Sequence, residues 1–101
     1  MPLFASGPRD HMSPDGHRLA LHRSARKHFR RDHLTDEAVI HAVDHALSSR
    51  PLDDESNPRR WLILGVDPAG RVLELVLLIF DDGASLIIHA MKARKQYISD
   101  I

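Results

Sequence analysis

The chain has 101 residues, with 14 Lys or Arg balanced by 14 Asp or Glu, so its formal net charge is zero. This length allows one small domain with a single hydrophobic core, and the lack of cysteine excludes disulfides and thiolate metal sites. No apolar run is long enough to span a membrane and the first residues lack the pattern of a signal peptide, so we expect a cytoplasmic protein that does not interact with membranes.

Charge is unevenly placed along the chain. Residues 17–33 contain six Arg or Lys and a single acidic residue, Asp32, and further basic residues follow residue 91. Acidic residues gather at 53–55 and at 81–82. Because a local basic patch can attract a phosphate group, the zero net charge does not exclude an anionic partner.

The first half of the chain predicts a lead segment and two helices. Residues 1–16 hold three Pro and two Gly, which is typical of a disordered or tag-like lead, so the single folded domain is expected at 17–101. Residues 17–31 have a basic, helix-forming composition with a thin apolar stripe that includes Leu19, Ala25 and Phe29.

The second helix is predicted to begin after Thr35 and to end at Pro51. Thr35 is a suitable N-cap, and Asp36 and Glu37 lie in the first turn, where the helix dipole favours acidic side chains. An apolar stripe would pack this helix on the sheet; it consists of Val39, Ile40, Val43, Ala46 and Leu47.

Three β-strands are predicted after an acidic loop at 51–58. Apolar runs at 61–66, 71–80 and 85–90 are separated by Asp67-Pro-Ala-Gly70 and by Asp82-Gly83, both of which favour turns. The sequence therefore predicts an α+β fold in which two N-terminal helices pack on a three- or four-stranded antiparallel β-meander. A short basic segment, residues 91–99, follows as a helix or as a continuation of the last strand.

The second turn determines which residues face one another in the last two strands. Asp82-Gly83 fits a two-residue type I′ turn, which places Val76 opposite His89 and Glu74 opposite Met91. Glu74 and His89 then become diagonal neighbours on one face, within reach of long side chains. In the first hairpin, a bulge at the type I turn would shift the register by one residue.

Alternation along the three strands divides the sheet into two faces. One face is expected to form the core, and it consists of Leu62, Leu64, Leu73, Leu75, Leu77, Ile79, Leu86 and Ile88. The other is expected to be half open, and it consists of Trp61, Ile63, Val72, Glu74, Val76, Leu78, Ser85, Ile87 and His89.

Glu74 and His89 stand out because they interrupt apolar strands. An imidazole exchanges protons near neutral pH, and a carboxylate beside it can accept a proton or fix its tautomer. The pair is therefore a candidate general acid and base. The alternative is a cross-strand polar pair that only stabilises the hairpin.

Positive charges lie directly beyond this pair in the sequence. Lys92, Arg94 and Lys95 offer cations to a phosphate, and Tyr97 offers a hydroxyl or a ring for stacking. Trp61 would stack on a base, or else cover the sheet edge or a dimer contact. The basic segment could equally be a solvated helix end.

A metal site is the other possibility that the sequence raises. His41 and His45 have the spacing of paired zinc ligands on a helix, but they flank its polar side, and such a spacing arises by chance among eight His. We therefore expect no metal and no cofactor. The chain has no Gly-rich phosphate loop, Ser nucleophile motif or Cys-His pair, which disfavours P-loop hydrolysis, serine hydrolysis and thiol chemistry.

Three segments carry a resemblance to a known family: Arg60-Trp-Leu-Ile-Leu-Gly65, Gly70-Arg-Val-Leu-Glu74, and Leu86-Ile-Ile-His-Ala-Met-Lys-Ala-Arg94 with Tyr97. Together with two preceding helices, they resemble BrnT-type toxins of the RelE superfamily, which act in bacterial toxin-antitoxin pairs. The resemblance covers residues 24–98. His89 and Met91 depart from the family pattern, and Arg31-Asp-His33 lacks the Gly of the family's Lys-His-Gly.

The resemblance implies an endoribonuclease that cleaves mRNA and is silenced by an antitoxin, typically a ribbon-helix-helix DNA-binding protein. Cleavage without a metal needs a base for the ribose 2′-hydroxyl, a cation for the charge on the phosphate, and an acid for the leaving 5′-oxygen. Glu74 is the candidate base and His89 the acid, or the reverse, while Arg94 and Lys92 stabilise charge. The predicted RNA-binding set is Lys92, Lys95, Tyr97, Trp61 and Arg60.

A non-enzymatic role is the alternative. The open face would then serve only as an interface, either in a dimer or in a complex with a small regulatory protein, and the chain would be a degenerate toxin or the partner of a dimeric regulator. In that case conservative changes at Glu74 and His89 would leave the function intact.

Overall fold

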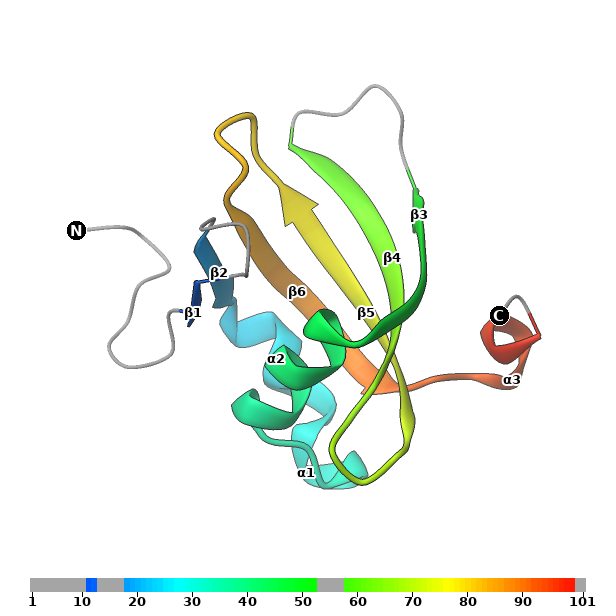
Figure 1. Ribbon diagram of the computed structural model, residues 1–101. Coiled ribbons are helices and arrows are strands. Elements are labelled where there is room, and N and C mark those ends of the chain that lie inside the picture. The colour runs from blue at the N-terminus through cyan, green and yellow to red at the C-terminus, as the bar shows by residue number, and fades with distance from the viewer. Residues whose placement is uncertain (1–10, 13–17, 53–57, 100–101) are drawn as a thin grey trace.

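The computed structural model describes residues 11–12, 18–52 and 58–99 (Figure 1). In this part of the chain, six strands form one sheet in the order β1-β2-β6-β5-β4-β3. The strands are β1 (His11–Met12), β2 (Arg18–Leu21), β3 (Ala46–Pro51), β4 (Arg59–Val66), β5 (Val72–Ile79) and β6 (Ser85–Lys92). The helical segments are the 3-10 helix η1 (Arg23–His28) and the α-helices α1 (Phe29–Asp32), α2 (Asp36–Asp44) and α3 (Lys95–Ile98).

The predicted fold, two helices on a three- or four-stranded antiparallel meander, is wrong. The sheet is mixed, since β2 pairs in parallel with β6, and the strands β1 and β3 extend its two edges. The meander of β4, β5 and β6 is present as the centre of this larger sheet. Each of the two predicted helices is shorter than expected, because part of it forms a strand.

The segment predicted as a helix at 17–31 is helical only from Arg23 onward. Arg18–Leu21 forms β2, in which Leu19 pairs with Ser85 and Leu21 with Ile87. The residues of β2 favour a helix by composition, but Leu19 and Leu21 are buried against the sheet, and this tertiary packing outweighs the local preference. Such a contact joins segments far apart in sequence, so periodicity does not reveal it.

The helix after Thr35 begins as predicted and ends earlier. The hydroxyl of Thr35 accepts a hydrogen bond from the backbone N–H of Ala38 at 3.1 Å, which caps the helix. Helix α2 ends at Asp44, and β3 follows as the edge strand beside β4. Leu47, which was placed in the apolar stripe, is 50% exposed.

The hairpin of β5 and β6 has the predicted pairing at Glu74, but its turn differs from the predicted one and a bulge restores the register. The N–H of Gly83 donates to the carbonyl of Phe80 at 2.9 Å, and in this loop only Gly83 has a positive φ, 88°. The type I′ turn is therefore wrong, and the pairs nearest the loop are shifted by one residue. A bulge at Ile88 cancels that shift, so Val76 faces His89 and Glu74 faces Met91, as predicted.

Strand β4 lies one residue out of the predicted register. Leu64 pairs with Glu74, and Ile63 pairs with Leu75. Trp61 and Ile63 therefore share the helix-covered face with the odd-numbered residues of β5, and Leu62 and Leu64 lie on the face of Glu74. The bulge in the third strand likewise puts Ile87, rather than Leu86 or Ile88, on the helix-covered face.

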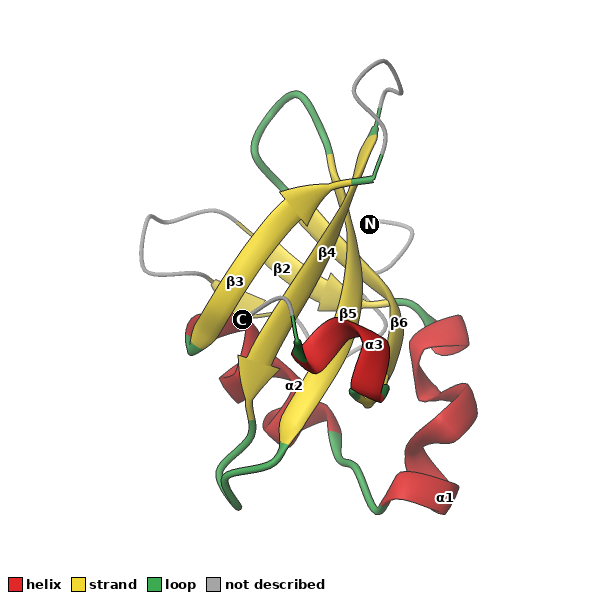
Figure 2. Cartoon of the chain, turned by 90° about the vertical axis from the view of Figure 1, so that its right-hand side faces the viewer, coloured by secondary structure: helices red, strands yellow, loops and turns green. Residues whose placement is uncertain are grey.

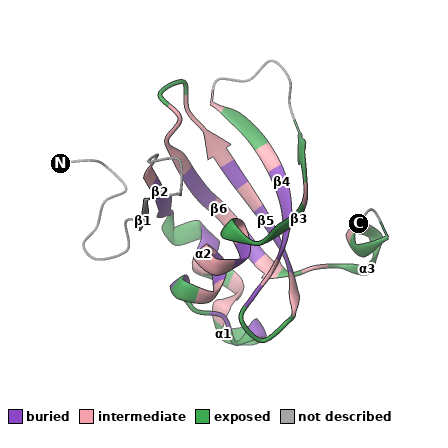
Figure 3. Ribbon diagram, viewed as in Figure 1, coloured by how far each residue is buried: buried purple, intermediate pink, exposed green. Residues whose placement is uncertain are grey.

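The hydrophobic core fills the space between the helix-covered face and the segments η1, α1 and α2. Figure 3 shows the buried residues concentrated in the central strands and on the inner side of α2. The core cluster consists of Leu19, Leu21, Ala25, Leu34, Val39, Ala42, Ile63, Leu73, Leu75, Leu77, Ile87 and Ala90.

The C-terminal segment lies on the other side of the sheet. Figure 2 shows α3 in front of β4 and β5, with α2 behind the sheet. The basic segment after residue 91 combines both predicted forms, because β6 continues to Lys92 and α3 begins at Lys95. Among the described residues, no helix has the length and apolar character needed to cross a membrane.

Candidate active site

Glu74 lies in the middle of the sheet with its carboxylate buried. Its neighbours across the two ladders are Leu64 of β4 and Met91 of β6, and its side chain is 1% exposed. The predicted half-open face is therefore closed at this position. A carboxylate in such surroundings needs hydrogen-bond donors, since burial of an unpaired charge is costly.

Four hydrogen bonds satisfy this carboxylate. Arg94 supplies three of them, from its backbone N–H and Nε to Oε1, both at 3.0 Å, and from Nη2 to Oε2 at 2.9 Å. The Nε2–H of His89 supplies the fourth, to Oε2 at 3.0 Å. The two strands and the segment after β6 thus meet at one buried anion, and the predicted proximity of Glu74 and His89 is confirmed.

The hydrogen bonds determine the protonation state of Glu74. Burial alone would raise its pKa, but the hydrogen bonds from the Arg94 side chain, the Arg94 backbone and His89 outweigh burial, so the pKa of Glu74 lies below its usual value. An ionised carboxylate with four donors is a weak proton acceptor. This geometry disfavours Glu74 as the base that abstracts a proton and favours a positioning role for it.

Arg94 is held where a phosphate could approach. The N–H of Ala93 donates to the carbonyl of Val72 at 2.9 Å, which continues the ladder one residue beyond β6 and turns Arg94 toward Glu74. Its side chain is nevertheless 50% exposed. The Tyr97 hydroxyl lies 3.5 Å from Nη2 of Arg94, and the guanidinium carbon lies 5.1 Å from the ring centroid. Glu74 orients the guanidinium from inside, and Tyr97 contacts it from outside.

His89 supplies the partly exposed imidazole of the cluster. Its side chain is 30% exposed, and its Nε2 is committed to Glu74, so Nδ1 is the nitrogen that can take up or release a proton. His28, at the end of η1, contacts this ring edge to face, with the centroids 5.9 Å apart and the planes at 81°. No local pattern in the sequence singles out His28, because its contact with β6 is visible only in the fold.

Comparison with known proteins does not assign the chain to a family. No protein-family model matches it, and no curated protein matches it. The resemblance to BrnT-type toxins is therefore a prediction that rests on the short motifs quoted above.

Lys92 contacts the carboxylate of Asp32 and not that of Glu74. Its backbone N–H donates to Oδ2 of Asp32 at 3.0 Å, and Arg31 holds the same carboxylate through Nε at 2.9 Å. Lys92 pairs with Leu73 in the ladder, so it belongs to the helix-covered face and not to the face of Glu74. Asp32 thereby fastens α1 to the end of β6.

The other predicted RNA contacts are spread over the molecule. Trp61 packs against the core on the helix-covered face, so the structure does not bring it to Glu74. Arg60 lies on the Glu74 face toward the far end of β4, and Lys95 is exposed at the start of α3. The acidic segment 53–55 lies outside the described residues.

His41 and His45 stack on each other instead of converging on a point. Their ring centroids are 3.9 Å apart and their planes differ by 10°. Nδ1 of His41 donates to the carbonyl of Val66 at 3.0 Å, and Nδ1 of His45 donates to the carbonyl of His41 at 2.8 Å. Parallel rings direct their remaining nitrogens side by side, and the described residues contain no group of three or more His, Cys, Asp or Glu placed to hold a metal.

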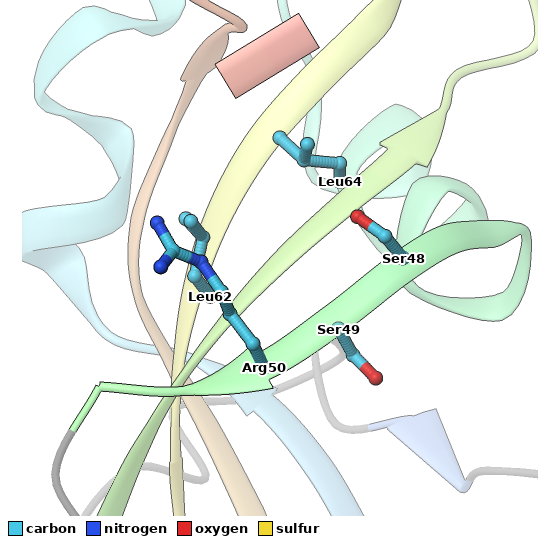
Figure 4. Close-up of a pocket in the computed structure, with 5 residues that line it drawn as sticks. All are labelled: Ser48, Ser49, Arg50, Leu62 and Leu64. Atoms are coloured by element: carbon cyan, nitrogen blue, oxygen red, sulfur yellow. The ribbon is translucent and has the colours of Figure 1, made fainter. Parts of the chain in front are cut away.

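A shallow hollow of about 200 Å³ lies between β3 and β4. It is lined by Ser48, Ser49, Arg50, Leu62 and Leu64, and the close-up shows Leu62, Leu64 and Arg50 together with both serines (Figure 4). Leu64 is the ladder partner of Glu74, so the hollow borders the same face of the sheet without containing the titratable cluster.

Proposed function

We propose that this chain is an endoribonuclease that cleaves mRNA by attack of a ribose 2′-hydroxyl on the adjacent phosphate, and that it is the toxin of a bacterial toxin-antitoxin pair. The observation that carries the proposal is the partly exposed imidazole of His89, held by a buried carboxylate that also aims the guanidinium of Arg94. This combination supplies a proton carrier and a cation at one place.

The residues have separate tasks in this proposal. His89 exchanges a proton through Nδ1, and Arg94 stabilises negative charge as the phosphate becomes pentacoordinate. Glu74 fixes the orientation of both groups and remains ionised. The O2′–P bond forms, the P–O5′ bond breaks, and the products are a 2′,3′-cyclic phosphate and a 5′-hydroxyl.

The toxin part of the proposal rests on the resemblance to BrnT-type proteins. The expected partners are mRNA and a cognate antitoxin of the ribbon-helix-helix type. Co-expression of such an antitoxin should relieve the growth arrest that the chain alone produces. Growth arrest without any change in RNA integrity would argue against ribonuclease activity.

The decisive experiment is an RNA cleavage assay with the purified protein in the presence of a chelator. We expect wild-type protein to produce 2′,3′-cyclic phosphate ends, His89→Ala to lose about 100-fold or more in rate, and Arg94→Lys to lose at least about tenfold. Arg94→Lys keeps a positive charge beside Glu74 but loses the pair of hydrogen bonds that Nε and Nη2 of Arg94 donate to the carboxylate.

A matched control makes this experiment specific. His45→Ala removes an exposed histidine from the end of α2, which packs on the helix-covered face of the sheet, opposite to the face of Glu74. This variant should cleave RNA at the wild-type rate. If His89→Ala and Arg94→Lys both keep the wild-type rate with unchanged melting temperature, the proposed site is wrong.

Two observations favour the non-catalytic alternative. The buried carboxylate of Glu74 is fully satisfied by the half-exposed Arg94 and by His89, which a structural role alone would explain. Leu47 is exposed on the edge strand β3, next in sequence to Ser48, which lines the hollow. Under this alternative, Leu47→Lys weakens association with a protein partner while His89→Ala has no effect. The two functions therefore predict opposite results for one pair of variants.

A further inference from the structure

His28 is fixed beside His89 by contacts at both ends of its segment. At the start of η1, the N–H of His22 donates to the carbonyl of Ile87 at 2.8 Å, and the hydroxyl of Ser24 donates to the carbonyl of Ile88 at 2.9 Å. Beyond His28, the carboxylate of Asp32 accepts from the N–H of Lys92. The segment therefore lies along β6 beyond the end of β2, and it brings His28 into contact with His89.

This placement puts the imidazole of His28 beside that of His89, which is hydrogen-bonded to the buried carboxylate of Glu74. Cleavage of a phosphodiester needs one proton donor and one proton acceptor, and two imidazoles can supply both. The ring centroids of His28 and His89 are 5.9 Å apart and the planes are nearly perpendicular. Both side chains are partly exposed. A single phosphodiester lying over the two rings could therefore contact both of them.

We propose that His28 and His89 are the base and the acid of the reaction, respectively, and that Glu74 is a positioning residue. His28 accepts the proton of the 2′-hydroxyl as the O2′–P bond forms. His89 gives a proton from Nδ1 to O5′ as the P–O5′ bond breaks, so protons and electron pairs balance without a co-reactant. This inference rests on the proposed ribonuclease function and extends it to a residue that the sequence did not indicate.

The charges around His28 support its role as the base. Partial burial lowers the pKa of His28, the positive charges of Arg31, His89 and Lys27 lower it further, and Asp32 acts in the opposite direction. Neutral imidazole, the form that accepts a proton, is thereby favoured at neutral pH. The influence of His89 also means that a proton on one ring disfavours a proton on the other, which suits a pair that divides the two tasks.

The groups that face His89 suit the role of acid. Glu74 of β5 accepts a hydrogen bond from Nε2–H of His89, and Arg94, in the segment after β6, donates to the same carboxylate. His28 of η1 contacts the His89 ring. The carboxylate fixes the tautomer and leaves Nδ1 as the nitrogen that reaches the leaving oxygen.

A substrate whose leaving group departs without protonation distinguishes the role of His89 as acid from the role of His28 as base. In uridine 3′-(4-nitrophenyl phosphate) the leaving nitrophenolate departs without protonation, whereas RNA requires protonation of O5′. We expect His89→Phe to lose about 100-fold or more in kcat/KM on RNA and less than about tenfold on the nitrophenyl ester. His28→Phe should lose about 100-fold or more on both substrates.

Phe is the informative replacement because it keeps an aromatic ring at the contact. If His28 only packed against His89, His28→Phe would remain within about threefold of wild type. His28→Gln is the second variant, since it keeps a polar side chain if Phe perturbs the fold, and it should show the same loss on both substrates.

The pH profile of kcat/KM provides the independent readout. The kcat/KM of wild type should follow a bell-shaped curve against pH. The fall at acid pH should disappear in His28→Gln, which lacks the base, and the fall at alkaline pH should disappear in His89→Gln, which lacks the acid. Wild-type cleavage with an unchanged bell in folded His28→Gln would overturn the assignment of His28 and leave the ribonuclease function in place. Failure of wild type to cleave either substrate would instead overturn the ribonuclease function itself.

Discussion

Glu74 shows how the surroundings of a residue change its chemistry. In the sequence it is a carboxylate next to an imidazole, which fits a general base. In the fold it accepts four hydrogen bonds, and its pKa lies below the usual value despite burial. The fold therefore makes Glu74 a weak proton acceptor that orients His89 and Arg94, and in the proposed ribonuclease it is a positioning residue.

Asp32 is the residue whose titration should be visible in stability. The Arg31 guanidinium lowers the pKa of Asp32 from 3.8 to about 2; burial acts against this shift, and the hydrogen bond from the Lys92 backbone adds to it. A carboxyl group with a lower pKa in the folded chain stabilises the fold above its unfolded pKa and loses this contribution as the pH falls through the folded value.

We therefore expect Asp32→Asn to flatten the fall in unfolding free energy between pH 4 and pH 2. In wild type, ionised Asp32 should contribute about 1 to 2 kcal/mol to the free energy of unfolding. The contribution is no larger because Arg31 is largely exposed and solvent screens the ion pair. Denaturant unfolding at several pH values measures it. Asp82→Asn, at the exposed hairpin loop, is the control and should follow the wild-type curve. Parallel curves for wild type and Asp32→Asn would contradict this assignment.

At the scale of elements, helix α2 and strand β4 pack so closely that one glycine is required between them. A Cβ atom at Gly65 would overlap the carbonyl oxygen of Ala42 in α2, whereas a Cβ at Gly70 would meet no atom within 4 Å. Gly70 instead has a φ of 84°, which suits the turn between β4 and β5. The two glycines thus serve different purposes, close packing and backbone conformation.

This difference predicts unequal costs for the same substitution. Gly65→Ala should lower the free energy of unfolding by about 3 kcal/mol, because α2 must move away from the sheet. Gly70→Ala should cost only about 1 kcal/mol, the strain of a left-handed backbone with a side chain. Chemical denaturation of both variants gives the comparison, and a larger loss in Gly70→Ala would show that the packing of α2 tolerates the added carbon.

At the scale of the whole molecule, the balanced net charge hides a separation of charged groups. Arg94 and Lys95 lie at the end of β6 near Glu74, whereas Asp81 and Asp82 lie at the opposite end of the β5–β6 hairpin, where Arg59 and Arg60 of β4 offset their charge. An anionic strand should therefore approach the end of the sheet that carries Glu74. Local fields of this kind steer a ligand even when the total charge is zero.

The proposed RNA contact should depend on salt. Lys95→Gln should lower the slope of log affinity against log salt by about 0.7, the value for loss of one phosphate contact to a single strand. Arg59→Gln, on the first residue of β4 at the far end of the sheet, should leave the slope unchanged. Binding of an RNA blocked by 2′-O-methylation measures both variants without cleavage. Equal slopes in all three proteins would exclude Lys95 from the RNA contact.

The sequence determined the local features of this protein. Apolar runs separated by turn residues identified β4, β5 and β6, Thr35 marked the start of α2, and the pairing of Glu74 with Met91 followed from the hairpin. These features depend on neighbours close in the chain. The pairing was right although the turn type was wrong, because the longer loop and the bulge at Ile88 shift the register in opposite directions.

Only the tertiary structure decided how distant segments combine. The parallel pairing of β2 with β6, the conversion of 46–51 into an edge strand and the shifted face of Trp61 all depend on which backbone groups and apolar side chains meet across the fold. The same applies to His28, which no local pattern links to His89. Periodicity reports which face of a segment is apolar, but the partner of that face is a property of the whole chain.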